Sequence, residues 1–122
     1  MTSQTISEKI LSSHAGRTLY AGDIAICGVD LVVGTDGSGP MAIDYFGQMG
    51  GSRLYDASRV FFSLDHYAPP NTPQTRAFHD RIRTFAGHHG ATVFPVGEGI
   101  SHQIVVERGL IGAGELMVGG GS

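Results

Sequence analysis

Short apolar segments typical of buried strands alternate along this chain with longer segments that have the spacing of amphipathic helices. Strands separated by helix-length segments favour βαβ units, in which neighbouring strands run parallel. The length of 122 residues suits one domain or a part of one. We therefore expect an α/β fold built on a mostly parallel sheet with flanking helices.

Capping and turn residues delimit the expected elements. Thr5 and Glu8 form a capping-box pattern, and Gly16 follows the helix that this box begins. In chain order we expect a helix over 5–14, a buried strand region over 24–33, a helix from Pro40 to Gly50, a strand over 60–64, a helix from Pro73 to Gly90, a strand over 91–96, a short helix over 103–107 and a strand over 115–118. The domain is expected to cover 1–118, and 119–122 to be a glycine-rich end, either a cut turn or a linker.

Charge and cysteine content exclude several classes of function. With 8 Lys and Arg against 11 Asp and Glu, the chain lacks the basic surface that binds nucleic acid. No apolar run approaches the roughly 20 residues that span a membrane, and the first residues do not have the pattern of a secretory leader. The single Cys27 excludes an internal disulfide and is interpreted as a small apolar residue of the expected 24–33 strand. We expect a cytoplasmic protein.

Polar residues follow the expected strands, at the sheet edge where parallel sheets hold their chemistry. Asp65 stands directly before His66, and a carboxylate beside an imidazole fixes the tautomer that a general acid needs. The alternative is a strand-end aspartate that caps backbone amides next to a surface histidine. The other polar sets at such positions are Thr35-Asp36, and Glu98 with His102.

The remaining histidines allow several interpretations. His102 follows a glycine-rich turn and either pairs with a carboxylate, ligates a metal, or is a buried histidine bonded to a carbonyl. His79, His88 and His89 lie on the expected helix before Gly90 and are interpreted as structural or surface residues.

Several segments, taken together and in order, match the pattern of one family. They are Thr5–Leu11 with Ala21–Ile24, Asp30–Ala42, Leu64-Asp65-His66, Gly97–Gln103 and Gly114–Gly119. The chain resembles the large subunit of 3-isopropylmalate dehydratase and homoaconitase, in the aconitase superfamily. The resemblance covers nearly the whole chain and implies the N-terminal part of the family's first α/β domain, that is, a partial aconitase-type domain.

The resemblance also implies roles for individual residues. Asp65 and His66 would form the acid pair that handles the substrate hydroxyl as it leaves as water. The implied catalytic set is Asp65, His66, His102 and Ser122, and the implied substrate-binding set is Thr35, Asp36 and Ser38. The family usually has Gln or His where Thr35 stands, and Ala-Asp-Ser-His where this chain has Gly120-Gly121-Ser122.

The cofactor implied by the resemblance is a [4Fe-4S] cluster whose open iron acts on the hydroxyl as a Lewis acid. Cys27 does not align with a cluster ligand, so we expect the ligands outside this chain and no metal ligand within it. The implied substrate is a 2-hydroxy di- or tricarboxylic acid such as isopropylmalate or homocitrate. The implied partners are the rest of the large subunit and a small subunit, and self-association is a further expectation. As an N-terminal fragment, the chain alone is expected to be an inactive lyase.

Two other hypotheses follow from the same residues. Thr35 and Gly121, at positions where the family has functional residues, favour a truncated or redesigned α/β module kept for folding or assembly. Alternatively, His66, His102 and Glu98 would hold a single metal ion in a hydrolase.

Overall fold

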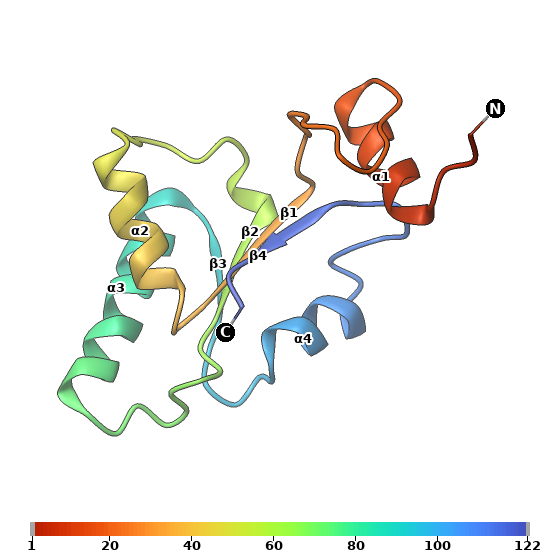
Figure 1. Cartoon of the computed structure of the whole chain (residues 1–122). Helices are drawn as coiled ribbons and strands as arrows, with labels where there is room; N and C mark the ends of the chain where they lie inside the picture. Colours follow the sequence, from red (N-terminus) through yellow and green to blue (C-terminus); the bar gives the residue numbers. More distant parts are fainter. Residues whose placement is uncertain (1, 122) are drawn as a thin grey trace.

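A four-stranded parallel sheet forms the centre of the computed structural model, which describes residues 2–121 (Figure 1). The strands lie in the order β3-β2-β1-β4. They are β1 (Leu31–Thr35), β2 (Val60–Ser63), β3 (Thr92–Phe94) and β4 (Met117–Gly119). The helices are α1 (Ile6–Ala15), α2 (Gly39–Gln48), α3 (Pro73–His89) and α4 (Ser101–Glu107), with a 3-10 turn at Ala57–Arg59. The expected α/β fold is confirmed, and all three strand pairings are parallel.

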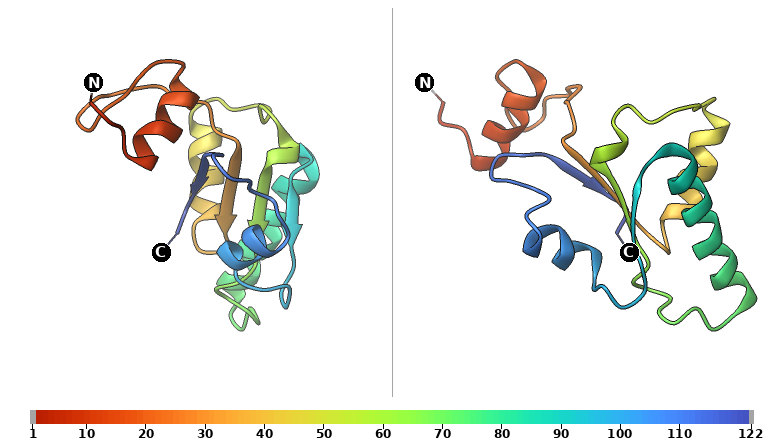
Figure 2. Two further views of the ribbon diagram at one scale, coloured as in Figure 1. Left: turned by 90° about the vertical axis from the view of Figure 1, so that its right-hand side faces the viewer. Right: turned by 180° about the vertical axis from the view of Figure 1, so that it is seen from behind.

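Apolar side chains pack on both faces of the sheet. α2 and α3 cover one face and α4 lies on the other (Figure 2). On the first face Phe62 of β2 packs with Ile82 of α3, and both are buried. On the second face Leu31 and Val33 of β1 pack against Val105 of α4. Because successive side chains of a strand point to opposite faces, both layers depend on the two central strands.

Local capping residues set the helix limits, as the sequence predicts. The Thr5 hydroxyl accepts from the backbone N–H of Glu8, whose carboxylate accepts from the N–H of Thr5, and α1 ends at Gly16 with φ 69°. Thr72 caps α3, which ends at Gly90 with φ 80°. Glycine tolerates this left-handed conformation, so both helices stop where the sequence indicates.

The strand expected over 24–33 is mostly wrong. Only Leu31–Thr35 forms β1, while Ile24 and Ile26 lie in an irregular segment and are 93% and 96% exposed. This segment passes alongside α1, where the N–H of Gly28 donates to the carbonyl of His14 at 2.9 Å. β-branched residues favour a strand only where a neighbouring strand is available to pair. Cys27, expected inside that strand, is a half-buried residue of this irregular segment.

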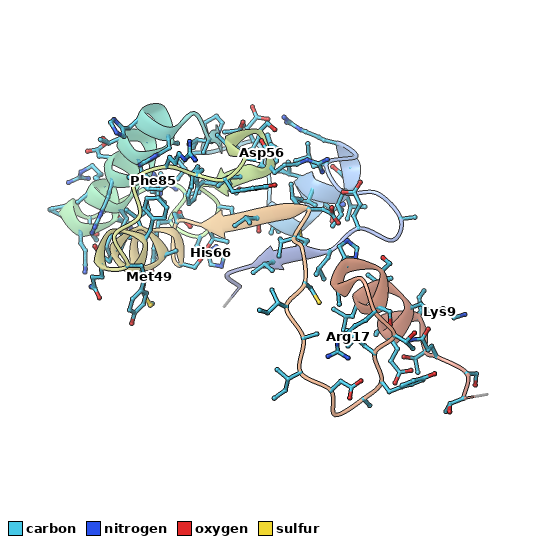
Figure 3. The ribbon with its side chains drawn as sticks, turned by 90° about the horizontal axis from the view of Figure 1, so that it is seen from above. Lys9, Arg17, Met49, Asp56, His66 and Phe85 are labelled. Carbon is cyan, nitrogen blue, oxygen red and sulfur yellow. The ribbon has the colours of Figure 1, made fainter. Side chains whose placement is uncertain are left out.

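The other expected elements are found, with shorter strands than expected. The last strand begins at Met117 and ends at Gly119, so β4 extends one residue into the segment expected to be the glycine-rich end. α1 lies apart from α2 and α3, and Figure 3 shows Lys9 and Arg17 at the opposite end of the molecule from Met49 and Phe85.

Within residues 2–121, no helix combines the length and apolar character needed to cross a membrane.

Candidate functional site

The ends of β1, β2 and β4 bring the predicted polar residues to one edge of the sheet. Thr35 is paired in register with Ser63, so the segments after β1 and β2 leave the sheet side by side. The N–H of Asp36 donates to the carbonyl of Ser63 at 3.0 Å and extends that pairing by one step. Parallel strands all end at the same edge, which is why residues far apart in sequence meet here.

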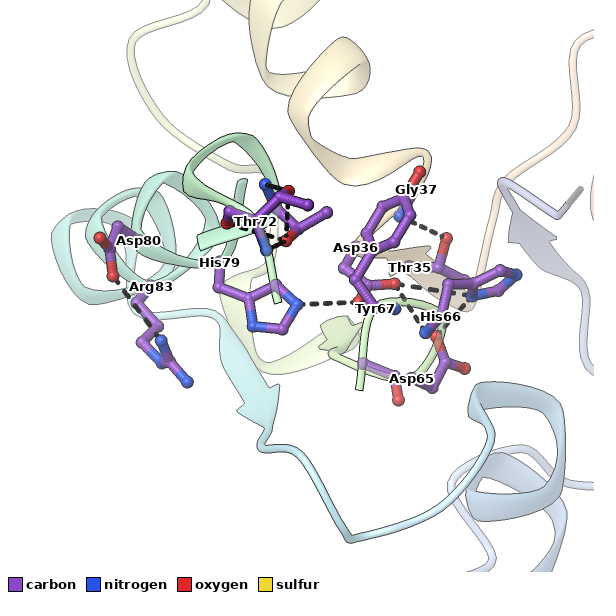
Figure 4. Close-up of polar contacts among 12 residues, drawn as sticks. Thr35, Asp36, Gly37, Asp65, His66, Tyr67, Thr72, His79, Asp80 and Arg83 are labelled. Carbon is purple, nitrogen blue, oxygen red and sulfur yellow. Dashed lines mark hydrogen bonds and ion pairs between the residues drawn. The ribbon is translucent and has the colours of Figure 1, made fainter. Parts of the chain in front are cut away.

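Asp65 and His66 form a direct side-chain pair at this edge (Figure 4). The Oδ1 atom of Asp65 lies 2.8 Å from Nδ1 of His66, and its Oδ2 atom accepts from the backbone N–H of Ser101 at 2.7 Å. The Asp65 side chain is buried, whereas that of His66 is 37% exposed. Because a carboxylate oxygen is an acceptor, Nδ1 carries a proton, and further proton exchange falls to Nε2.

Adjacent residues of an extended strand point to opposite faces, so this pair requires the chain to turn after Leu64. The carboxylate of Asp36 supports that turn. Its Oδ1 accepts from the backbone N–H of His66 at 2.9 Å, and its Oδ2 accepts from that of Tyr67 at 2.8 Å. A third donor, Nε2 of His79 on α3, lies 2.9 Å from Oδ2.

Asp36 is 0% exposed, and its surroundings favour the ionised form. Burial by itself raises the pKa of this carboxyl, but the backbone N–H groups of Tyr67 and His66 and the ring of His79 outweigh it. The pKa of Asp36 therefore lies below its ordinary value of 3.8.

Thr35 and Ser38 close the loop between β1 and α2. The Thr35 hydroxyl accepts from the N–H groups of Gly37 and Ser38, each at 3.2 Å. The Ser38 hydroxyl accepts from the N–H of Thr35 at 3.0 Å and donates to the carbonyl of Gly120 at 2.8 Å. A methyl group at position 120 would lie 2.7 Å from Oγ of Ser38, so the glycine allows the two loops to approach this closely.

His102 lies exposed on the first turn of α4, next to Ser101. It lines a hollow of about 240 Å³ together with Thr35 and Gly120. The predicted site residues Thr35, Asp36, Ser38, Asp65, His66 and His102 thus all lie at the carboxyl edge of the sheet. Ser122 lies outside the described residues.

One group of potential metal ligands lies at this edge of the sheet. Among residues 2–121, Asp36, Asp65 and His66 offer ligand atoms within 4.8 Å of one another. Every carboxylate oxygen of the two aspartates already lies within hydrogen-bond distance of a nitrogen. Glu98 and His102 do not belong to this group, and Glu98 pairs with Arg108. The geometry therefore does not bring together the three residues of the metal-hydrolase hypothesis.

An iron–sulfur cluster needs several cysteine thiolates, and Cys27 is the one cysteine of the sequence. Cys27 precedes β1, at the opposite edge of the sheet from Asp65 and His66, with its Sγ 3.7 Å from the carbonyl of Leu11. The residues of this chain do not fit the ligand set of a cluster.

His79 is the residue of this edge that sequence reasoning missed. Of its two interpretations, structural or surface, the surface one is wrong, because His79 is buried on α3 and bonded to Asp36. The buried residues of α3 are Thr75, His79, Ile82 and Ala86. Their spacing of three and four residues places His79 on the buried stripe, and that spacing is the signal that would have found it.

Proteins similar to this chain include dehydratase large subunits. It is 35% identical over 98% of its length to the 3-isopropylmalate dehydratase large subunit of Elusimicrobium minutum, and 34% identical to large subunit 1 of Thermotoga maritima. The 2,3-dimethylmalate dehydratase large subunit of Eubacterium barkeri is 33% identical over 97% of the chain. The chain spans only 28–29% of the length of these relatives. No protein-family profile matches it.

Proposed function

We propose that this chain, which is homologous over nearly its whole length to part of the 3-isopropylmalate dehydratase large subunit, forms one side of an active site. The proposed activity of that site is that of a hydro-lyase. The observation that carries this proposal is the Asp65–His66 pair, with its 2.8 Å contact at the carboxyl edge of the sheet. The named relatives are dehydratase subunits, and the pair supplies a proton-transfer group of the kind that dehydration requires.

Dehydration of a 2-hydroxy acid breaks a C–O bond while the hydroxyl receives a proton and a neighbouring carbon loses one. In our proposal His66 delivers the proton to the leaving hydroxyl, through Nε2, because Asp65 holds Nδ1. The base that removes the carbon-bound proton would come from sequence outside this chain. The substrate class we propose is a hydroxy di- or tricarboxylate such as isopropylmalate, 2,3-dimethylmalate or homocitrate.

Other residues of the edge would surround that substrate. His102 and Thr35 line the same hollow, and Ser38 lies between the ends of β1 and β4. We propose that Thr35 and Ser38 lie on the side of the substrate carboxylates and that His102 borders the reacting centre. The catalytic role that the resemblance implies for Ser122 falls outside the described residues.

A [4Fe-4S] cluster would bind through cysteines outside this chain, since Cys27 is at the wrong edge. When bound, such a cluster supplies a Lewis acid to the substrate hydroxyl.

The partners we propose are the remaining large-subunit sequence and a small subunit. The relatives are more than three times as long as the matched segment, and their names call them large subunits. An apolar hollow of about 860 Å³ beside β1 and α2, with Val32 and Val118 exposed at its lining, supports association, either with that sequence or between copies of the chain.

Turnover in a reconstituted enzyme tests the proposal. The chain is combined with the downstream large-subunit sequence and a small subunit under iron–sulfur reconstitution, and dehydration of isopropylmalate and 2,3-dimethylmalate is followed. We expect turnover from the mixture and none from the chain alone. His66→Ala should lower turnover by about 10²–10⁴, the usual contribution of a general acid.

His88→Ala is the matched control, because His88 is an exposed histidine of α3. Near-normal turnover of His66→Ala would remove His66 from the acid role. A properly assembled mixture that turns over neither substrate would favour the non-catalytic module. Stoichiometric zinc or manganese in the purified chain would instead favour a metal hydrolase.

A further inference from the structure

Asp36 does not lie where it can touch a substrate. It is fully buried, and its two oxygens accept from the N–H groups of His66 and Tyr67 and from His79. A buried carboxylate with three donors is strongly held in position, because charge-assisted hydrogen bonds are shorter and stronger than neutral ones. The contacts of Asp36 thus point to the backbone turn that carries His66 and away from the solvent-facing surface.

The contact with Asp36 also explains why a histidine occupies the buried position 79. Its ring is buried on α3, Nε2 faces Asp36 at 2.9 Å, and Nδ1 has no hydrogen-bond partner among the described residues. A buried nitrogen without a partner destabilises a protein, and an apolar side chain would fill this site without that cost. The bond to Asp36 is the interaction that an apolar residue could not provide.

α3 is a rigid base for this contact. It has 17 residues, begins at the capping residue Thr72 and packs through Ile82 on the sheet. The contacts run from His79 to Asp36, then to the N–H groups of His66 and Tyr67, as Figure 4 shows. Nδ1 of His66 consequently lies between two carboxylates, 3.6 Å from Asp36 and 2.8 Å from Asp65.

We propose that His79 and Asp36 are positioning residues that fix the turn after β2 and thereby the direction and tautomer of the His66 ring. The inference rests on the proposed function, because it gives His79 and Asp36 a role through the acid His66. It differs from the role that the family resemblance implies for Asp36, which is contact with substrate.

NMR of the ¹⁵N-labelled 122-residue chain tests the proposal without any turnover. Two signals are measured: hydrogen exchange of the His66 and Tyr67 amides, and the ring ¹⁵N shifts of His66. In His79→Leu we expect exchange of both amides to rise about tenfold or more, as for the loss of one hydrogen bond, and the ring shifts to move toward a mixture of tautomers. The amide of Leu31, at the other end of β1, should keep its rate.

His79→Gln is the rescue variant, because its side-chain amide can still donate to Asp36. It should restore both signals, and His88→Leu, on the exposed side of α3, should leave them unchanged. The proposal is overturned if His79→Leu leaves the two amides and the ring shifts as in the parent chain. It is equally overturned if Leu31 accelerates by the same factor, or if His79→Gln behaves like His79→Leu.

Asp36→Asn provides a second route should His79→Leu fail to fold. Its one remaining side-chain oxygen cannot serve both N–H groups as the carboxylate does, so exchange at His66 or Tyr67 should rise with Leu31 unchanged. Unchanged exchange at both would contradict the proposal. Since these signals come from the chain alone, a reconstituted enzyme without turnover would refute the proposed function and leave the positioning contacts intact.

Discussion

The two ends of strand β1 carry the same pairing, an aspartate with a histidine, in different surroundings. Before the strand, Oδ2 of Asp30 lies 2.5 Å from Nε2 of His14 and accepts from the N–H of Leu116. After the strand, Asp36 accepts from His79 and from two backbone N–H groups. The side chain of Asp30 is 32% exposed, and that of Asp36 is 0% exposed.

The difference shows that surroundings decide what such a pair does. The Asp30–His14 pair joins α1 to the sheet, so its loss affects the attachment of one helix. The Asp36–His79 pair lies beneath a turn that carries a polar, partly exposed histidine. The first pair serves the docking of α1, whereas the second serves the geometry of the candidate site.

The largest difference in stability between the two ends of β1 is expected when the carboxylate at each end is removed. Asp36→Ala leaves the buried ring of His79 and two partly buried backbone N–H groups without their acceptor, and we expect it to lower the free energy of unfolding by about 3–5 kcal/mol. Asp30→Ala should cost less and loosen α1 preferentially, because the pair is partly exposed to water. Urea unfolding followed by circular dichroism measures both variants, and equal losses would contradict the comparison.

Adding one methyl group at each end gives the next largest effect. In Gly34→Ala the new Cβ would lie 2.8 Å from a ring carbon of Phe62, so we expect a loss of about 1–3 kcal/mol by overpacking. Gly28→Ala is the matched control, since its Cβ would meet the carbonyl of His14 at an ordinary 3.9 Å. Similar urea midpoints for the two variants would show that the carboxyl edge tolerates more displacement than its packing indicates.

Raising the pH should weaken the Asp30–His14 pair at the amino end of β1. The carbonyl of Ile10 and the carboxylate of Asp30 raise the pKa of His14 above 6.5, so its stabilising effect is present below that pH and is lost as pH rises through the raised pKa. The N–H of Leu116, followed by His14, lowers the pKa of Asp30 below 3.8, so its contribution is lost only as pH falls through that lowered value.

The Asp30–His14 pair should therefore be intact between about pH 4 and 6.5. Above that window, hydrogen exchange of the α1 amides should accelerate more than that of the His66 and Tyr67 amides, because the carboxylate of Asp36 stays ionised. His14→Gln should remove this excess alkaline sensitivity of α1. Persistence of the full sensitivity in that variant would assign it to another group.

The smallest expected effect concerns the contact between the loops after β1 and β4. Gly120→Ala should destabilise the chain by about 0.5–1 kcal/mol, since its Cβ would lie 2.7 Å from Oγ and 2.8 Å from Cβ of Ser38. Ser38→Gly in the same chain should recover part of that loss, and thermal melts of the single and double variants measure the coupling. Strictly additive losses would mean that the two loops adjust independently.

Features encoded by neighbouring residues could be predicted from the sequence. The limits of α1 and α3 follow from Thr5, Gly16, Thr72 and Gly90, whose capping contacts lie within a few residues. The meeting of the polar strand ends at one edge also followed, because it is a property of every parallel sheet.

Features that depend on distant packing could not be predicted in this way. The segment containing Ile24 and Ile26 has strand composition, but composition does not tell whether a partner strand is available. Asp36 and His79 are 43 positions apart in sequence, and their contact depends on how α3 lies on the sheet. The helical spacing indicates that His79 is buried but leaves its partner undetermined.

The Ser38 hydroxyl donates to the Gly120 carbonyl and so connects the loop after β1 to the segment after β4. A second hydrogen bond fixes the segment after β4, because the N–H of Gly120 donates to the carbonyl of Val33 in β1. A ligand that competes for that hydroxyl would therefore loosen the loops after β1 and β4 together. The hollow that Thr35 and His102 line would change shape with both loops.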